Sequence, residues 1–159
     1  MSFLEALEYS ALGDWVATSP WGYPALLAAH SVGLAIIVGI LFALNLRILG
    51  SFPGIKLDAM RGMLKLAWAG FVLNLASGVA LFIAQATFFI THPAFLVKIG
   101  AIFLAIVDAA LIQNILRHNA ASWDKGGSVS TKTKVLATAS LLLWLTAIVA
   151  GRLIAYIES

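Results

Sequence analysis

The chain has 159 residues, of which 62% are hydrophobic and only 11% charged, and its mean hydropathy is +0.99. A soluble domain is about half apolar and about 25% charged, so this composition excludes a water-soluble fold. The absence of cysteine excludes disulfides, thiolate metal sites and iron–sulfur clusters. In a membrane protein, basic residues gather on one side of the membrane, and we attribute the net charge of +3 to this distribution. We therefore expect no nucleic-acid partner.

The first expected element is a short interfacial helix over Ser2–Leu12, where apolar residues recur at helical spacing. Four runs long enough to cross a bilayer follow, at Tyr23–Leu46, Leu66–Ile90, Ala94–Leu116 and Val135–Ile157. They leave no room for a separate soluble domain. Residues 1–159 are therefore predicted to form one all-α domain, an integral membrane four-helix bundle. The first 22 residues lack a basic start and a continuous apolar stretch, so we expect no signal peptide.

Lysine and arginine lie almost entirely in two alternate connections of this predicted bundle. The connections over 47–65 and 117–134 carry four basic residues each: Arg47, Lys56, Arg61 and Lys65, then Arg117, Lys125, Lys132 and Lys134. Basic residues favour the cytoplasmic side, so both termini, including the tail Glu158–Ser159, are predicted to lie outside. The expected location is the inner membrane of a bacterium, with periplasmic termini.

Small residues recur every four positions in each predicted span and are expected to mark the packed faces, since they allow helices to approach closely. The rows are Ser31, Ala35, Gly39 and Ala43; Gly70, Asn74 and Gly78; Ala101, Ala105 and Ala109; and Ala147, Gly151 and Ala155.

Four polar side chains, one from each span, are predicted to share a layer near the outer face. At 1.5 Å per residue, Lys98, Arg152, Gln85 and His30 lie about 6, 8, 8 and 10 Å from the outer ends of their helices. Polar groups at this depth are costly, and a site in the bundle interior would require one from each helix. Tyr156, one turn beyond Arg152, and His92 in the outer turn are expected to close the site. Two cations with no carboxylate at their depth favour an anionic ligand.

A second layer holds Asp108 and Asn74, about 21 and 24 Å from the outer face. We expect Asp108 to be neutral there and to form an interhelical hydrogen bond with Asn74. A proton-relay role for Asp108 is the alternative.

Several segments resemble a family of small bacterial four-span membrane proteins of unknown function. They include Trp21–Leu26, His30–Gly33, Pro93–Phe95 followed by Lys98, and the closing Gly151–Tyr156 pattern, which is the most specific. The resemblance covers nearly the whole chain. A more distant, architectural likeness links the chain to copper-resistance membrane proteins of the CopD kind and to four-helix b-type cytochromes.

Two functions remain open at this point. The first is binding of a haem-like or other anionic redox cofactor, with haem b as the candidate, His30 as the iron ligand, and Lys98 and Arg152 at the propionates. The second is an accessory subunit that packs against a larger membrane complex or a second copy, with lipid as its other partner. A copper or zinc site would need His92 to fold back over His30. The sequence carries no enzymatic signature, and an activity is left open.

Overall fold

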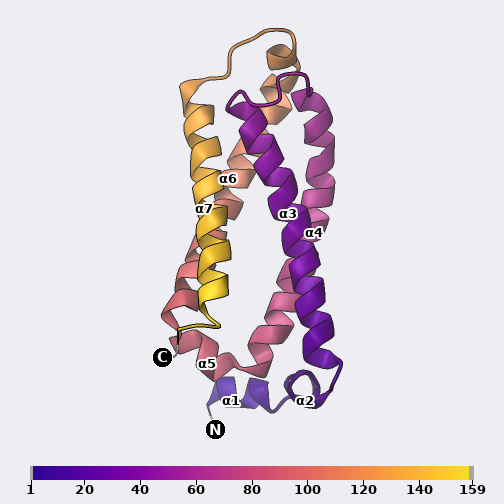
Figure 1. Ribbon diagram of the computed structural model, residues 1–159, viewed down its shortest axis with the longest axis vertical. Helices are drawn as coiled ribbons and strands as arrows, with labels where there is room; N and C mark the ends of the chain where they lie inside the picture. Colours follow the sequence, from indigo (N-terminus) through magenta and orange to yellow (C-terminus); the bar gives the residue numbers. More distant parts are fainter. Residues whose placement is uncertain (1, 158–159) are drawn as a thin grey trace.

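A computed structural model describes residues 2–157, and within them every regular element is a helix (Figure 1). Four of the helices are long, and three are short. In chain order they are α1 (Phe3–Glu8), α2 (Ala11–Thr18), α3 (Gly22–Ile48), α4 (Leu57–Ala84), α5 (Ala86–Thr91), α6 (Pro93–Asp124) and α7 (Thr131–Leu153). The all-α four-helix architecture predicted from the sequence is confirmed.

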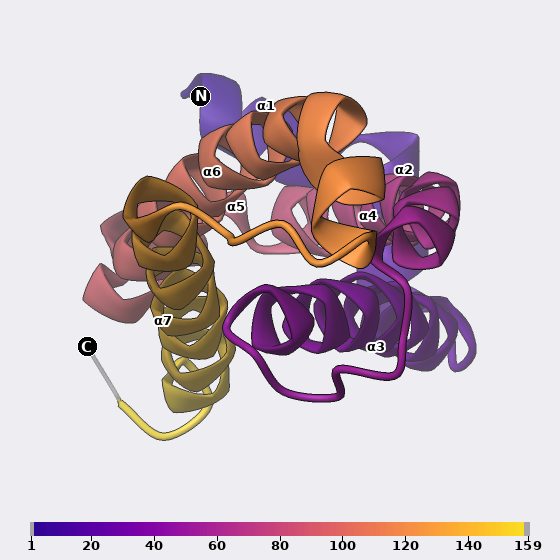
Figure 2. The ribbon, with the colours of Figure 1, turned by 90° about the horizontal axis from the view of Figure 1, so that it is seen from above.

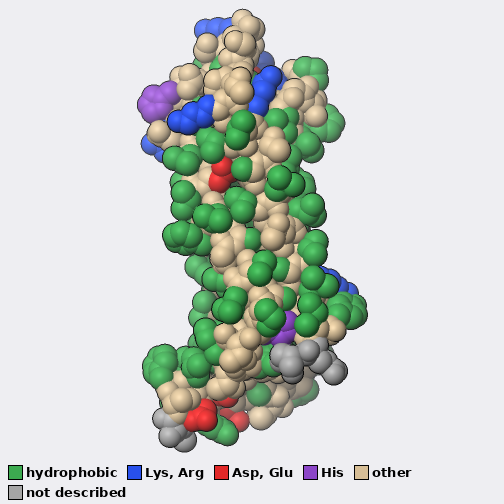
Figure 3. Space-filling model, turned by 90° about the vertical axis from the view of Figure 1, so that its left-hand side faces the viewer, with side chains coloured by type: hydrophobic (Ala, Val, Ile, Leu, Met, Phe, Trp, Pro, Cys, Tyr) green, Lys and Arg blue, Asp and Glu red, His purple; other side chains and the backbone are tan. Residues whose placement is uncertain are grey.

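The four long helices α3, α4, α6 and α7 are each long and apolar enough to cross a membrane. The chain is thus a multi-pass membrane protein. On the face shown in Figure 3, apolar side chains cover the middle of the molecule, and most of the visible lysines and arginines gather near the α3–α4 and α6–α7 connections. We call this the basic end and the opposite one the α5 end.

The bundle consists of two antiparallel hairpins, α3–α4 and α6–α7, whose internal contacts are more extensive than those between them. Seen from above in Figure 2, the long helices surround a common interior. The contiguous apolar core lies in the half near the basic end, where Leu44, Leu57, Leu116 and Trp144 are almost fully buried. Toward the α5 end, α3 and α7 diverge in Figure 1.

The second predicted span differs most from the structure. In place of a helix over Leu66–Ile90, α4 begins at Leu57 and ends at Ala84, and Gln85 breaks the helix with φ −146° and ψ 45°. Each new boundary has a partner from elsewhere in the chain. Asp124 accepts hydrogen bonds from the amides of Leu57 and Asp58 at 2.8 and 2.9 Å, which caps the start of α4.

The start of α5 is held by Glu8. Its carboxylate accepts hydrogen bonds from the amide and the hydroxyl of Thr87 at 2.8 and 2.7 Å, so α1 docks where the helix breaks. The two hydrogen bonds hold the pKa of the Glu8 carboxyl below its usual value. The predicted interfacial helix over Ser2–Leu12 is in fact two helices, because Ser10 caps a second one through the amide of Gly13.

The other spans are correct in number but shifted in extent. The first and third run further than Tyr23–Leu46 and Ala94–Leu116, to Gly22–Ile48 and Pro93–Asp124. The fourth is Thr131–Leu153 rather than Val135–Ile157, because the Ser130 side chain accepts the amide of Thr133 and starts α7 earlier. Of the predicted tail, Glu158 and Ser159 lie outside the described residues.

The small-residue row predicted for the first span is wrong. Ser31, Ala35, Gly39 and Ala43 are all exposed on α3. The close approach to α4 is instead made by Gly33, where an added Cβ would lie 2.6 Å from the Asn74 amide nitrogen and 2.7 Å from the Gly70 carbonyl oxygen. The α6 row of Ala101, Ala105 and Ala109 is buried as expected, as is Ala147 on α7.

Candidate functional site

The imidazole of His30 is held by the tight contact between α3 and α4. Its Nδ1 lies 2.9 Å from the carbonyl oxygen of Asn74, and the Asn74 side-chain amide donates to the carbonyl of His30 at 2.8 Å. Because a carbonyl only accepts, Nδ1 carries the proton in this bond. The second ring nitrogen, Nε2, then presents a free lone pair.

Lys98 reaches the same region from α6 and lies across Gly151 of α7. A Cβ at Gly151 would be 3.3 to 3.5 Å from Cδ, Cε and Nζ of Lys98, so glycine leaves the room that the lysine side chain occupies. Lys98 is half-buried. The neighbouring Arg152 is exposed, and its guanidinium lies 5.9 Å from the centre of the Tyr156 ring in a cation–π contact.

His30, Lys98 and Arg152 line one cavity of about 440 Å³ between the two hairpins at the α5 end. The four residues of the predicted outer layer, His30, Gln85, Lys98 and Arg152, all contribute to its wall. No aspartate or glutamate of the described chain lines it. A concave site of this size, mostly apolar with a few convergent polar groups, is typical of small-molecule sites.

Aromatic rings form the other wall, and sequence reasoning missed them. Phe82 of α4 and Phe95 of α6 stack with ring centres 5.6 Å apart, and Phe89 of α5 lies 5.2 Å from Phe95 and 6.3 Å from Phe82. Phe88 also lines the cavity. The sequence signal that could have identified this wall is the number of phenylalanines in and on both sides of the segment that forms α5. The break at Gln85 brings these rings together.

A groove of about 310 Å³ lies beside the cavity, between α4 and α6. Five residues line both spaces, so His30 and Lys98 stand where they meet: His30, Gly78, Phe82, Phe95 and Lys98. Toward the membrane the groove is bordered by Leu75, Val79 and Ile99, which are exposed. The groove is therefore open sideways between the two hairpins, next to the cavity.

Two residues expected at the top of the site lie elsewhere. His92 is fully buried, its Nε2 is 2.8 Å from the carbonyl of Ile157, and it lines neither the cavity nor the groove. It therefore does not fold over His30. Within residues 2–157 no three His, Asp or Glu side chains form a group that could hold a metal ion. Tyr156 does not line the cavity and flanks it through Arg152.

The predicted pair of Asp108 and Asn74 is wrong. The Asn74 side chain is engaged with His30, as described above, because it faces α3. Asp108 lies beside Ser140 of α7, and its Oδ2 is buried without a hydrogen-bond partner among the described residues. The depth of Asn74 was counted from Ile90, but α4 ends at Ala84, so Asn74 lies at the level of His30 and not in a deeper layer.

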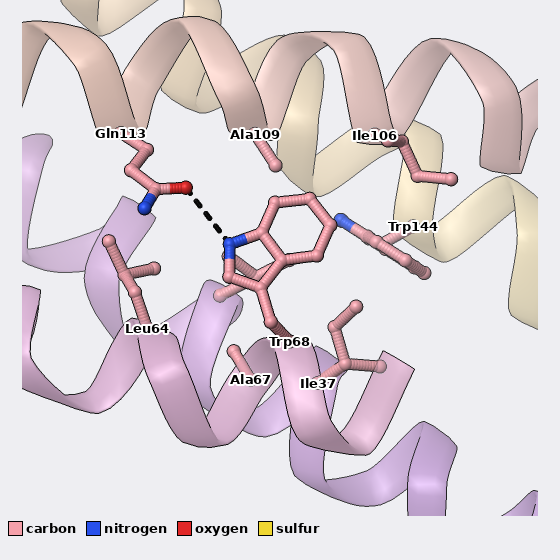
Figure 4. Close-up of a pocket in the computed structure, with 9 residues that line it drawn as sticks. Ile37, Leu64, Ala67, Trp68, Ile106, Ala109, Gln113 and Trp144 are labelled. Carbon is pink, nitrogen blue, oxygen red and sulfur yellow. Dashed lines mark hydrogen bonds between the residues drawn. The ribbon is translucent and has the colours of Figure 1, made fainter. Parts of the chain in front are cut away.

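A third space lies at mid-bundle, in the apolar core (Figure 4). Its volume is about 10 Å³, and it is lined by residues that include Trp68 and Trp144. The indole of Trp68 donates to Oε1 of Gln113 at 2.9 Å beside it. This space holds at most one water molecule and is no ligand site.

The chain matches no protein-family model, no curated protein and no solved structure.

Proposed function

We propose that the protein binds a flat, anionic redox cofactor in the cavity at the α5 end, with haem b as the best fit. The observation that carries this proposal is the composition of the cavity. A histidine with a fixed tautomer, His30, stands with Lys98 and Arg152 in a space lined by no described carboxylate. The two positive charges are then compensated by the ligand.

The residues present fit a haem group. A histidine that ligates a metal usually donates its other ring N–H to a carbonyl or carboxylate, and His30 does so to Asn74. Lys98 and Arg152 would hold the propionates by charge-assisted hydrogen bonds. Phe82, Phe89 and Phe95 would supply an apolar surface beside the ring. Among the described residues, His30 is the one histidine that lines the cavity, so it is the residue that would hold the haem iron. The bound haem would supply one-electron chemistry.

Absorption spectroscopy tests this proposal. Protein expressed with ample haem and purified in mild detergent is expected to show a Soret band, which His30→Ala abolishes. Arg152→Gln is expected to weaken haem retention. His118→Ala is the matched control, because His118 is exposed on α6 outside the cavity, and it should leave the band unchanged. A colourless wild-type preparation under these conditions would refute haem as the ligand.

An accessory subunit of a larger membrane complex, or of a homo-oligomer, is the second candidate function. The exposed row on α3, Ser31, Ala35, Gly39 and Ala43, favours it, because small residues at this spacing are typical of helix–helix interfaces in membranes. Replacing Ala35 by leucine should then dissociate a co-purifying membrane partner or a second copy while leaving His30 and any Soret band unaffected. If no larger species is found in mild detergent before and after the change, this candidate fails.

For orientation, we propose that the α5 end faces the periplasm of a bacterial inner membrane. The eight basic residues of the two connections at the opposite end support this arrangement. Cysteines introduced at Lys56 and Lys125 should be labelled from the cytoplasm only, and one introduced at Ser2 from the periplasm only. Labelling of position 125 from the periplasm would overturn the orientation.

A further inference from the structure

We propose that the groove between α4 and α6 is a lateral portal through which the ligand enters from the lipid phase, and that the ligand class is a carboxylated amphiphile with an apolar body. This inference rests on the cavity of the proposed function. Haem, a flat dicarboxylate, belongs to the class, but the portal does not depend on haem being the ligand.

The N-terminal helices cover part of the α5 end of the bundle, which favours the sides as routes to the cavity. Helices α1 and α2 pack across the ends of α3, α4 and α5 (Figure 1). Glu8 fastens α1 to Thr87, and Val16 of α2 is fully buried. Nearer α7, the bond from Nε2 of His92 to the carbonyl of Ile157 ties the α5–α6 turn to the chain that follows α7. From the lining residues we infer two mouths, one between α3 and α7 and one between α4 and α6.

The two mouths differ in chemistry. The α3–α7 side presents Arg152 and Tyr23, which suit the charged headgroup region of a membrane. Leu75, Val79 and Ile99 border the α4–α6 side, and their side chains are about half exposed at 51%, 49% and 47%. Both helices are long and apolar enough to span the bilayer, so we expect these exposed apolar side chains to face hydrocarbon. The transfer of an apolar chain from lipid into this groove therefore costs little free energy.

Lys98 gives the portal its selectivity. It lines both the groove and the cavity, and neither space is lined by a described carboxylate that would neutralise it. A carboxylate that follows the groove inward therefore meets a cation at the junction, with His30 beside it. An uncharged amphiphile of the same length gains no such contact. From the membrane inward, the path presents apolar side chains first and the Lys98 cation second. A ligand whose acid group enters first would place its carboxylate at Lys98 and leave its apolar body among the apolar side chains of the groove.

Photolabelling in lipid nanodiscs tests the portal with a defined probe, stearic acid carrying a mid-chain diazirine. We expect adducts on α4 and α6 at the groove that excess unlabelled stearic acid competes away. The labelling of ordinary lipid-facing positions is not saturable. The same diazirine chain ending in an alcohol should give no saturable adduct, and Lys98→Met should remove saturation for the acid.

Val79→Trp should block the groove and abolish the saturable adduct. Val72→Trp is the matched control, since Val72 is also an exposed valine of α4, at 63%, but does not line the groove. Ile99→Phe, from the facing helix, provides a second block if Val79→Trp does not fold. Thermal unfolding of each variant verifies folding.

The outcomes separate the portal from the haem proposal. Saturable labelling that is lost in the blocked variants, in protein without a Soret band, supports the portal and refutes haem. A Soret band in protein whose labelling is non-saturable, or is unchanged by Val79→Trp and Ile99→Phe, refutes the portal and leaves the haem proposal standing. Equal loss in Val72→Trp would also refute the portal.

Discussion

Substituting alanine for Gly33 should test whether the close contact between α3 and α4 positions His30. A Cβ at this position would meet backbone atoms of α4, the Asn74 amide nitrogen at 2.6 Å and the Gly70 carbonyl oxygen at 2.7 Å. Backbone atoms cannot move away by a change of rotamer. The two helices therefore have to separate locally by about 0.8 Å to reach ordinary contact near 3.4 Å.

The magnitude follows from three contributions. Overpacking of this kind costs about 1–3 kcal/mol. The two bonds between His30 and Asn74, at 2.9 and 2.8 Å, lie one turn away, and a separation of about 0.8 Å stretches them beyond hydrogen-bonding range. Each interhelical hydrogen bond in a membrane contributes about 0.6 kcal/mol. Alanine regains about 1 kcal/mol of helix propensity, so the expected net loss is about 1–3 kcal/mol.

Unfolding in mixed detergent and SDS micelles, followed by far-ultraviolet circular dichroism, measures this loss. Gly39→Ala is the matched control, because Gly39 lies on the same helix and a Cβ there would meet no atom within 4 Å. It should be neutral or stabilising by up to about 1 kcal/mol. Unchanged stability of Gly33→Ala, or an equal loss in Gly39→Ala, would refute the reasoning.

Three further predictions concern the helix ends and the buried acid. Asp124→Ala removes both cap bonds at the start of α4, including that to Leu57, and should lower the free energy of unfolding by about 1–2 kcal/mol in the same assay. Because the folded-state pKa of Glu8 is lowered, its hydrogen bond to Thr87 is fully present above the usual pKa of 4.5 and is lost as the pH falls through the lowered value. Proteolysis of the N-terminal helices of the wild-type protein should therefore become faster only below pH 4.5. Glu8→Ala should already show this faster proteolysis at neutral pH. Asp108→Asn should change stability by less than about 1 kcal/mol, since Oδ2 of Asp108 has no hydrogen-bond partner among the described residues to lose and the amide has nearly the same size; a larger loss would show that the charge of the acid is required.

Predicting the candidate site from the sequence succeeded for the four cavity residues and failed for the second polar layer. Counting residues from the span ends placed His30, Gln85, Lys98 and Arg152 in one layer, and all four line one cavity. The same count placed Asn74 about 14 Å deeper than His30, yet the two residues are hydrogen-bonded, because α4 ends at Ala84 and not at the predicted Ile90. Depth can be counted from the sequence only where the end of the helix is predicted correctly, and the end of α4 depends on tertiary contacts.

The sequence by itself determined the class of this protein, the number of its spans and the polar layer, because bilayer thickness and the cost of buried charge act on each helix separately. Tertiary structure alone decided the break at Gln85, the early start of α4 and the packing of Gly33. Each of these features depends on a partner that is distant in sequence. Glu8 accepts a hydrogen bond from Thr87 just after the break, Asp124 accepts one from Leu57 at the start of α4, and the Asn74 backbone lies against Gly33. The row of small residues on α3 illustrates the reason. Its spacing is compatible with packing, but the face of a helix that meets a neighbour is selected by the neighbour, and here α4 packs against Gly33.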